Sequence, residues 1–299
     1  MIRIGTAGWK YRDWAGRVYP KPKPRGFDEL SYLAGFFSMV EINSSFYGPP
    51  RPNAARGWVE RIAHRPEFWF TAKLWRGFTH GRNATQADEK LFKEGMEPLM
   101  TAGRLGAVLL QFPWSFKNEQ ENRVYVRRLG EKFAEYPLVL EVRHSSWTDP
   151  AWLDSLAEMN IGFCNIDQPL FHRSVAPSAR STAKVGYVRL HGRNYKQWFS
   201  AQANVRDRYD YLYTANELER WADRTRVVAE DSEETYVVTN NHNLGKAAVN
   251  AFELCALLGR PVEPPPQLVA AYPELQELAS EKTKSELASE ETKSLFSMQ

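Results

Sequence analysis

Leu138-Val-Leu-Glu-Val-Arg-His144 is a short apolar run that becomes charged at its end, and the same pattern recurs along the chain. A parallel strand that is apolar over most of its length is buried on both faces, so only its last residues can reach a site. Seven other segments share this pattern: residues 2–6, 39–43, 68–73, 107–111, 161–167, 185–191 and 236–242. Eight such strands predict an α/β fold, a single TIM-type (β/α)8 barrel whose strand ends converge on one face.

Helical patterns fill most of the intervals between these strands. Apolar residues follow helical spacing in 52–64, 87–100 and 119–133, and 244–258 is closed by Gly259. Asp149-Pro150 and Thr214-Ala-Asn-Glu217 are typical helix starts. Strand and helix in alternation require a parallel sheet. Two connections, 168–184 and 192–213, are polar and irregular, and the second is long enough to carry function.

Length and composition fit one barrel with a tail. The chain has 299 residues and is 43% hydrophobic, and a barrel of this type needs roughly 250 residues. We expect a barrel domain over 1–263. Three prolines from Pro264 then form a boundary to a low-complexity C-terminal appendage over 264–299, in which 278–285 is nearly repeated as 287–294.

The sequence also restricts the compartment and the partners. It contains no apolar run long enough to span a membrane and no pattern of a secretory signal, so we expect a cytoplasmic protein. Cys164 and Cys255 are expected to be buried free thiols. The 39 basic and 36 acidic residues nearly cancel, so the net charge of +3 gives no support for nucleic-acid binding.

Polar residues at the strand ends define the candidate site. Because side chains alternate along a strand, Glu41 shares a face with Asn43, Glu141 with Arg143, and Arg189 with His191. Lys73 and Asp167 end two further strands, and we expect all these groups to point into the barrel. One interpretation is an internal network of ion pairs that stabilises the barrel, since buried charges need partners.

The alternative interpretation is an active site. Three histidines near strand ends (His144, His191 and His242) suit proton transfer, and the nearby Lys and Arg side chains suit a phosphate or carboxylate. We therefore predict an enzyme that uses acid/base chemistry on an anionic small molecule or phosphodiester. The predicted catalytic residues are Glu41, Glu141, His144 and His191. The predicted substrate-binding residues are Trp9, Asn43, Tyr47, Lys73, Gln111, Arg143, Trp147, Asp167, Arg189, Asn240, Asn241 and His242.

Two other functions stay open at this point. One is a metal-dependent hydrolase or isomerase, with ligands drawn from the same carboxylates and histidines. The other is a non-catalytic protein that binds an anion or a nucleic acid. The chain lacks H-x-H, H-E-x-x-H and C-x-x-C spacing, and neighbouring cations would compete with a metal ion, so we predict neither metal nor cofactor.

These residues resemble the YecE-like family, catalogued as domain of unknown function 72. The resemblance covers residues 2 to about 260 and is carried by motifs in the same order along the chain. They are Gly5-Thr-Ala-Gly-Trp9, Tyr11 with Trp14 and Tyr19-Pro20, Glu41-Ile-Asn-Ser-Ser-Phe-Tyr47, Phe70-Thr-Ala-Lys73 with Thr79-His80, Leu110-Gln-Phe-Pro113, Glu141-Val-Arg-His-Ser-Ser-Trp147, Tyr187-Val-Arg-Leu-His-Gly192 and Asn240-Asn-His242. The resemblance implies a TIM-type barrel and implies no particular reaction.

Overall fold

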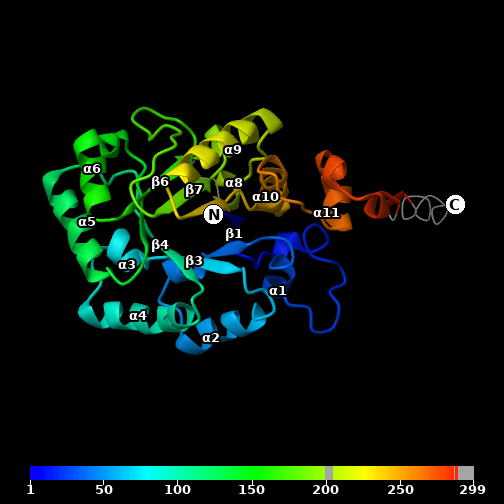
Figure 1. The fold of residues 1–299 in the computed structure, drawn as a ribbon, viewed down its shortest axis with the longest axis horizontal. Coiled ribbons are helices and arrows are strands. Elements are labelled where there is room, and N and C mark those ends of the chain that lie inside the picture. The colour runs from blue at the N-terminus through cyan, green and yellow to red at the C-terminus, as the bar shows by residue number, and fades with distance from the viewer. Residues whose placement is uncertain (199–204, 286, 289–299) are drawn as a thin grey trace.

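Eight parallel strands close into a barrel in the computed structural model, which describes residues 1–198, 205–285 and 287–288 (Figure 1). The strands pair in sequence order, and β8 returns to β1. They are β1 (Ile2–Ala7), β2 (Met39–Ile42), β3 (Trp69–Lys73), β4 (Leu105–Gln111), β5 (Leu138–Glu141), β6 (Gly162–Asp167), β7 (Val185–Leu190) and β8 (Glu234–Thr239). The predicted fold class is confirmed.

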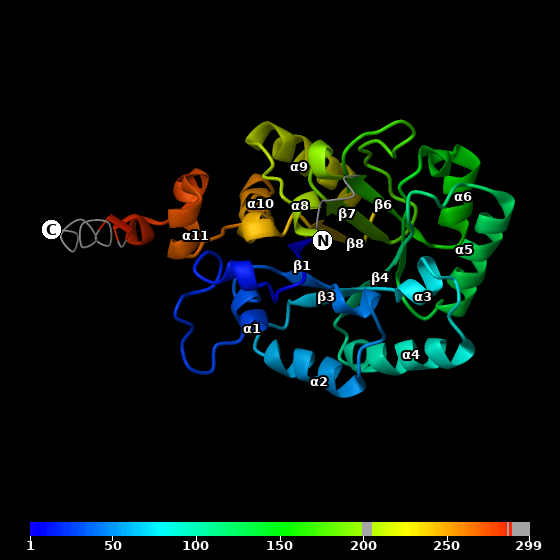
Figure 2. The same cartoon turned by 180° about the vertical axis from the view of Figure 1, so that it is seen from behind.

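Helices surround the strands on the outside, with α2 and α4 on one side of the molecule and α5 and α6 next to them (Figures 1 and 2). The helices are α1 (Glu29–Leu33), α2 (Pro52–Arg61), α3 (Arg76–Thr79), α4 (Gln86–Thr101), α5 (Gln120–Lys132), α6 (Pro150–Glu158), α7 (Tyr195–Trp198), α8 (Val205–Arg208), α9 (Ala215–Glu230), α10 (Lys246–Leu257) and α11 (Pro266–Ala271). Short 3-10 helices are η1 (Arg12–Trp14), η2 (Ser44–Phe46), η3 (Ser145–Thr148), η4 (Asn243–Gly245) and η5 (Pro273–Leu278).

Local sequence sets where several helices begin. Thr214 and Glu217 form a reciprocal capping box at the start of α9, as the sequence predicts, because each side chain bonds the other's backbone N–H. Asp149 caps α6 by accepting a hydrogen bond from the backbone N–H of Trp152, and Pro150 occupies the first turn. As expected, the connection over 168–184 contains no helix.

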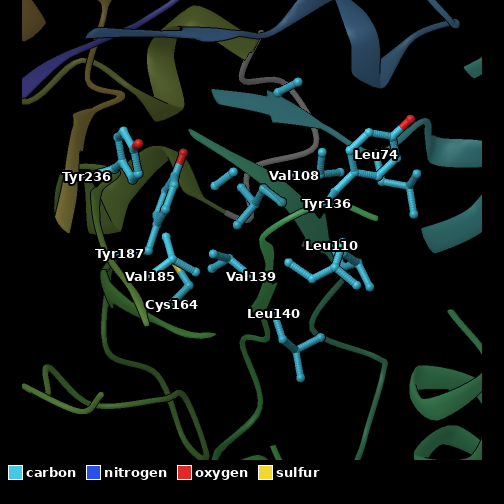
Figure 3. Close-up of a cluster of buried hydrophobic side chains, with 14 of the residues drawn as sticks. Leu74, Val108, Leu110, Tyr136, Val139, Leu140, Cys164, Val185, Tyr187 and Tyr236 are labelled. Atoms are coloured by element: carbon cyan, nitrogen blue, oxygen red, sulfur yellow. The ribbon is translucent and has the colours of Figure 1, made fainter. Parts of the chain in front are cut away.

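Inside the barrel, the side chains on the amino-terminal side of the charged residues are mainly apolar (Figure 3). Tyr187 and Tyr236 lie beside Cys164, Val139 and Val185 inside the ring of strands. A Cβ atom on Gly106 of β4 would lie 2.1 Å from the hydroxyl oxygen of Tyr236, so only glycine fits there. A second apolar cluster lies between the strands and α9, α10 and α11. The charged residues inside the barrel lie nearer the carboxyl ends of the strands, where Glu41, Glu141 and Arg189 meet.

Some sequence expectations are refined. Four strands end earlier than predicted, at Ile42, Glu141, Leu190 and Thr239, so several site residues belong to the loops that follow. Cys164 and Cys255 are both buried and free. Leu268 and Val269 of α11 are fully buried against the barrel's outer helices, while most of the second repeat copy lies outside the described residues. None of the helices in the described part of the chain has the length and apolar character to cross a membrane.

Candidate functional site

Arg189 lies at the centre of the site, on β7 near the carboxyl end of the barrel. Its guanidinium binds Glu41 of β2 with two hydrogen bonds, of 3.0 Å from Nε and 2.7 Å from Nη2. Nη1 reaches Glu141 of β5 at 3.2 Å. All three side chains are completely shielded from solvent. One arginine therefore joins two carboxylates across the barrel, as the network interpretation predicts.

Glu141 accepts four hydrogen bonds. Its Oε1 receives Nε2 of Gln111 at 2.7 Å, Nη2 of Arg143 at 3.0 Å and Nε2 of His191 at 3.0 Å, and Oε2 receives Arg189. Burial alone would raise the pKa of Glu141, but the neighbouring Arg189 guanidinium and the other donors hold that pKa well below its usual range. Glu141 is an ionised anchor for these side chains.

His191 is neutral in this setting. Burial lowers its pKa to about 3, and Arg143 and Arg189 act in the same direction, although Glu141 opposes them. Because an ionised carboxylate only accepts, Nε2 carries the proton shared with Glu141. Nδ1 then accepts from Nδ2 of Asn240 at 3.0 Å. This neutral tautomer holds Glu141 in place.

Tyr187 contacts the buried ionic network on its amino-terminal side. Its hydroxyl donates to Oε2 of Glu41 at 3.0 Å and lies 2.8 Å from Oγ1 of Thr71. Tyr187 of β7 and Thr71 of β3 both face the barrel interior, and their strands lie on opposite sides of the barrel. The charged layer thus rests directly on the apolar layer that Figure 3 shows.

Above this layer, partly solvent-accessible cations form a rim. Nζ of Lys73 lies 4.0 Å from Oε1 of Glu41, and Nη1 of Arg143 donates to Oε1 of Gln168 at 3.1 Å. The side chains of Lys73 and Arg143 are 9% and 14% exposed, against none for Arg189. Burial and the charge of Arg189 lower the pKa of Lys73 to about 7.

His80 and Arg76 of the α3 region complete the rim, and neither is among the site residues predicted from the sequence. The ring of Phe46 contacts the His80 ring edge-on at 5.0 Å between centroids and lies 5.2 Å from Nζ of Lys73. Burial lowers the pKa of His80 to about 4, and Arg76, Arg143 and Lys73 contribute. The positive charges of Arg76, Arg143 and Lys73 thus lie close to the His80 ring.

An open crevice of about 500 Å³ lies beside the strand ends of β1 and β2. Four predicted binding residues line it: Trp9, Asn43, Tyr47 and His242. The other lining residues are Gly8, Lys10, Tyr11, Ser44, Trp58 and Arg61. The His242 ring stacks on Tyr11 at 4.5 Å, and Trp9 meets Trp58 edge-on at 5.7 Å. The crevice is rich in rings and basic groups, and none of the described residues that line it carries a carboxylate.

Asp167 belongs to a different cluster, which corrects the expectation that it points into the barrel. Arg193 binds its carboxylate from Nε at 2.9 Å and from Nη2 at 2.9 Å, and also contacts Glu217 of α9. Asn165, on the same face of β6, bonds the backbone of Arg180 outside the strands. The expectation failed because it assigned the polar residues of β6 to the inner face, which Cys164 and Ile166 occupy with the apolar interior.

Three other predicted residues also lie away from the polar cluster. His144 caps η3 through Ser146 and packs on Trp114, so its ring is directed away from its neighbour Arg143. Trp147 is fully buried and donates to the backbone oxygen of Phe116, so it is not a pocket wall.

The third is Asn241, which bonds Asn250 of α10 on the outer side of β8, whereas the adjacent Asn240 faces inward to His191. Because successive side chains point to opposite sides of the chain, Asn240 and Asn241 reach different partners although they are neighbours.

Among the described residues, no group of three or more His, Cys, Asp or Glu side chains is arranged to hold a metal ion.

Fold and site together define the class: a (β/α)8-barrel protein with a buried ionic layer and a cationic rim at the carboxyl ends of its strands. The chain belongs to the DUF72 family, since the family model described as "Protein of unknown function DUF72" matches residues 3–274. It is 32% identical over 276 residues to the UPF0759 protein YunF of Bacillus subtilis, covering 86% of this chain and 95% of that protein.

Other relatives and solved structures agree. The UPF0759 protein YecE of Escherichia coli is 29% identical over 146 residues, 48% of this chain and 49% of that protein. A DUF72 protein of Thermotoga maritima has a TM-score of 0.73 at 31% identity, covering 86% of this chain and 99% of that one. A DUF72 protein of Enterococcus faecalis has a TM-score of 0.76 at 25% identity, with coverages of 86% and 95%.

Proposed function

We propose that this protein is an enzyme that applies acid/base chemistry to an anionic small molecule or a phosphodiester at the mouth of the barrel. The observation that carries the proposal is the charge balance of six side chains. Glu41 and Glu141 carry two negative charges, and the cations Arg189, Arg143, Lys73 and Arg76 carry up to four positive charges. With Lys73 protonated the difference is 4 − 2 = +2, and with Lys73 neutral it is 3 − 2 = +1, so either state favours an anion.

The ligand would meet the rim rather than the buried layer. Arg189 is fully enclosed and already bound to two carboxylates, so its role is to hold them. Arg143 and Lys73 are the partly exposed cations that face the mouth, and Arg143 is oriented by Glu141 and Gln168. A guanidinium fixed in this way binds phosphate or carboxylate with defined geometry.

The chemistry we propose uses Lys73 for proton transfer. Glu141 is a poor base because four donors occupy it and its pKa is low. A lysine whose pKa lies at about 7 exchanges a proton readily near neutral pH. Glu141 and His191, which the sequence analysis placed as catalytic groups, then act by positioning Arg143.

The crevice beside the mouth would hold the remainder of the substrate. Trp9, Tyr11 and Tyr47 offer ring surfaces, Asn43 offers an amide, and Tyr47 is 70% exposed. Rings of this kind pack against flat or apolar ligand surfaces. We further propose a cytoplasmic location, which two buried unpaired thiols support.

Binding of inorganic phosphate, measured by titration calorimetry at low ionic strength, tests the anion site. We expect Arg143→Gln to weaken phosphate binding about tenfold, the equivalent of about 1.4 kcal/mol. Arg128→Gln on the exposed face of α5 is the matched control and should bind as the parent does. Equal affinity in both variants would refute the anion site. Turnover of bis(p-nitrophenyl) phosphate then separates an enzyme from a protein that only binds anions.

A further inference from the structure

We propose that Nζ of Lys73 is a nucleophilic amine that forms an imine with the carbonyl group of an anionic substrate. The inference deepens the proposed function and rests on it, because the anion site is where this substrate would bind. It names the substrate class as a carbonyl compound that carries a phosphate or carboxylate.

The first support is a shortage of acceptors around Lys73. Its nearest carboxylate oxygen, Oε1 of Glu41, is 4.0 Å away and already receives Arg189 at 2.7 Å. The other oxygen of Glu41 receives both Arg189 and Tyr187 at 3.0 Å. Within the described part of the chain, Nζ makes no hydrogen bond, and the Phe46 ring lies 5.2 Å from it. An ammonium group here lacks the acceptors that it would have in water.

The second support is the charge around Lys73 from every strand and helix that faces it. These groups are Glu41 on β2, Arg76 and His80 in the α3 region, Glu141 and Arg143 at β5, and Arg189 on β7. The two carboxylates are matched by the two arginines bound to them, so a proton on Lys73 adds an unmatched charge. Burial and Arg189 accordingly lower the pKa of Lys73 from 10.5 to about 7.

The covalent step needs no further reactant. The neutral amine attacks the carbonyl carbon, a C–N bond forms, and the carbonyl oxygen leaves as water with the two amine hydrogens. The imine can then accept a proton from water and become an iminium ion. In that state the substrate's own anionic group, held near Arg143, supplies the negative charge that the free site lacks. A neutral lysine and a rim that binds anions are thus parts of one arrangement.

Pyridoxal 5′-phosphate is a suitable probe because it combines an aldehyde with a phosphate. The full chain is incubated with a small excess of the probe, reduced with borohydride, digested and mapped by mass spectrometry across pH 5.5–10. We expect Lys73 to be labelled at least tenfold faster than Lys90, whose side chain is 78% exposed on α4. The midpoint of the Lys73 rate should lie near pH 7. Lys73→Arg should remove the label and Lys90→Arg should leave it unchanged.

The outcomes separate this inference from the proposed function. Labelling of Lys73 no faster than that of Lys90, or a midpoint above pH 9, overturns the imine even if phosphate binding is lost in Arg143→Gln. Fast labelling at neutral pH that inorganic phosphate suppresses supports the inference. Fast labelling that phosphate does not suppress supports the nucleophilic amine and overturns the anion site as the place of binding. The parent protein gives the decisive rates, so the result does not depend on the folding of a variant.

Discussion

Replacing Arg189 by methionine tests whether the buried ionic layer is held together by this one side chain. The substitution keeps much of the volume and removes the charge that two fully buried carboxylates share. Removing one partner from a buried pair costs about 3–5 kcal/mol, because it leaves charge without compensation. For a chain of this size, that corresponds to a fall in melting temperature of roughly 5–9 °C at pH 7.5.

The pH dependence gives the sharper test. In the parent protein the pKa of Glu141 lies well below its usual value of 4.5, so its contribution to stability is present above that pH and is lost as the pH falls through the lowered pKa. Without Arg189, the buried carboxylates take up protons more easily. The loss of stability in Arg189→Met should therefore be smaller at pH 5 than at pH 8.

Urea unfolding followed by circular dichroism at pH 5, 6.5 and 8 measures both effects. Arg226→Met is the control, since Arg226 and Asp223 form an exposed pair with side chains 49% and 75% accessible, and should change the free energy of unfolding by less than about 0.5 kcal/mol. The double variant Arg189→Met/Glu41→Gln should recover part of the loss. A loss below about 1 kcal/mol at pH 8, or one that grows toward pH 5, would refute the reasoning.

Three further changes address neighbouring contacts. Burial lowers the pKa of His191 to about 3, so the unfolded chain binds a proton there between pH 6 and 4 and the folded protein does not. As the pH falls over that range, the free energy of unfolding of the parent should decrease by roughly 1.4 kcal/mol per pH unit because of this group. His191→Gln should reduce this slope, as measured by urea unfolding at fixed pH values. Tyr187→Phe removes the donor to Glu41 and should cost about 1–3 kcal/mol at pH 7.5, and an unchanged unfolding midpoint would contradict this. Thr214→Ala removes a helix cap and should cost about 1 kcal/mol, while Thr214→Ser should restore most of it.

The closed barrel could be predicted from the sequence because most of its strands are apolar until their last residues. That pattern locates the barrel mouth, and alternation along β2, β5 and β7 correctly predicts that Glu41, Glu141 and Arg189 meet. Alternation alone does not say which face is inward. On β6 the inward residues are apolar, so Asp167 was assigned to the wrong side.

Other features depend on tertiary contacts that no local pattern contains. His144 and Asn241 each follow an inward-facing residue by one position, so their side chains point to the other side of the chain. Grouping polar residues by their closeness in sequence does not distinguish these two directions. His80 lies seven residues beyond the end of β3, and its ring contacts Phe46 at the rim. The signals available in the sequence are its position after a strand and the pair Thr79-His80 among the motifs of the family resemblance.

The ion-pair interpretation and the active-site interpretation describe two depths of one arrangement. The deep layer, with Arg189 between Glu41 and Glu141, has no exposed side chain and satisfies itself. Because that layer uses up the carboxylate oxygens, Lys73 above it is left with a distant counter-charge. Because Arg189 and its two carboxylates are held rigidly, they fix the surroundings of Lys73 and thereby its position and its lowered pKa. A mutation in the deep layer should thus alter stability and the titration of Lys73 together, whereas Lys73→Arg should alter chemistry alone.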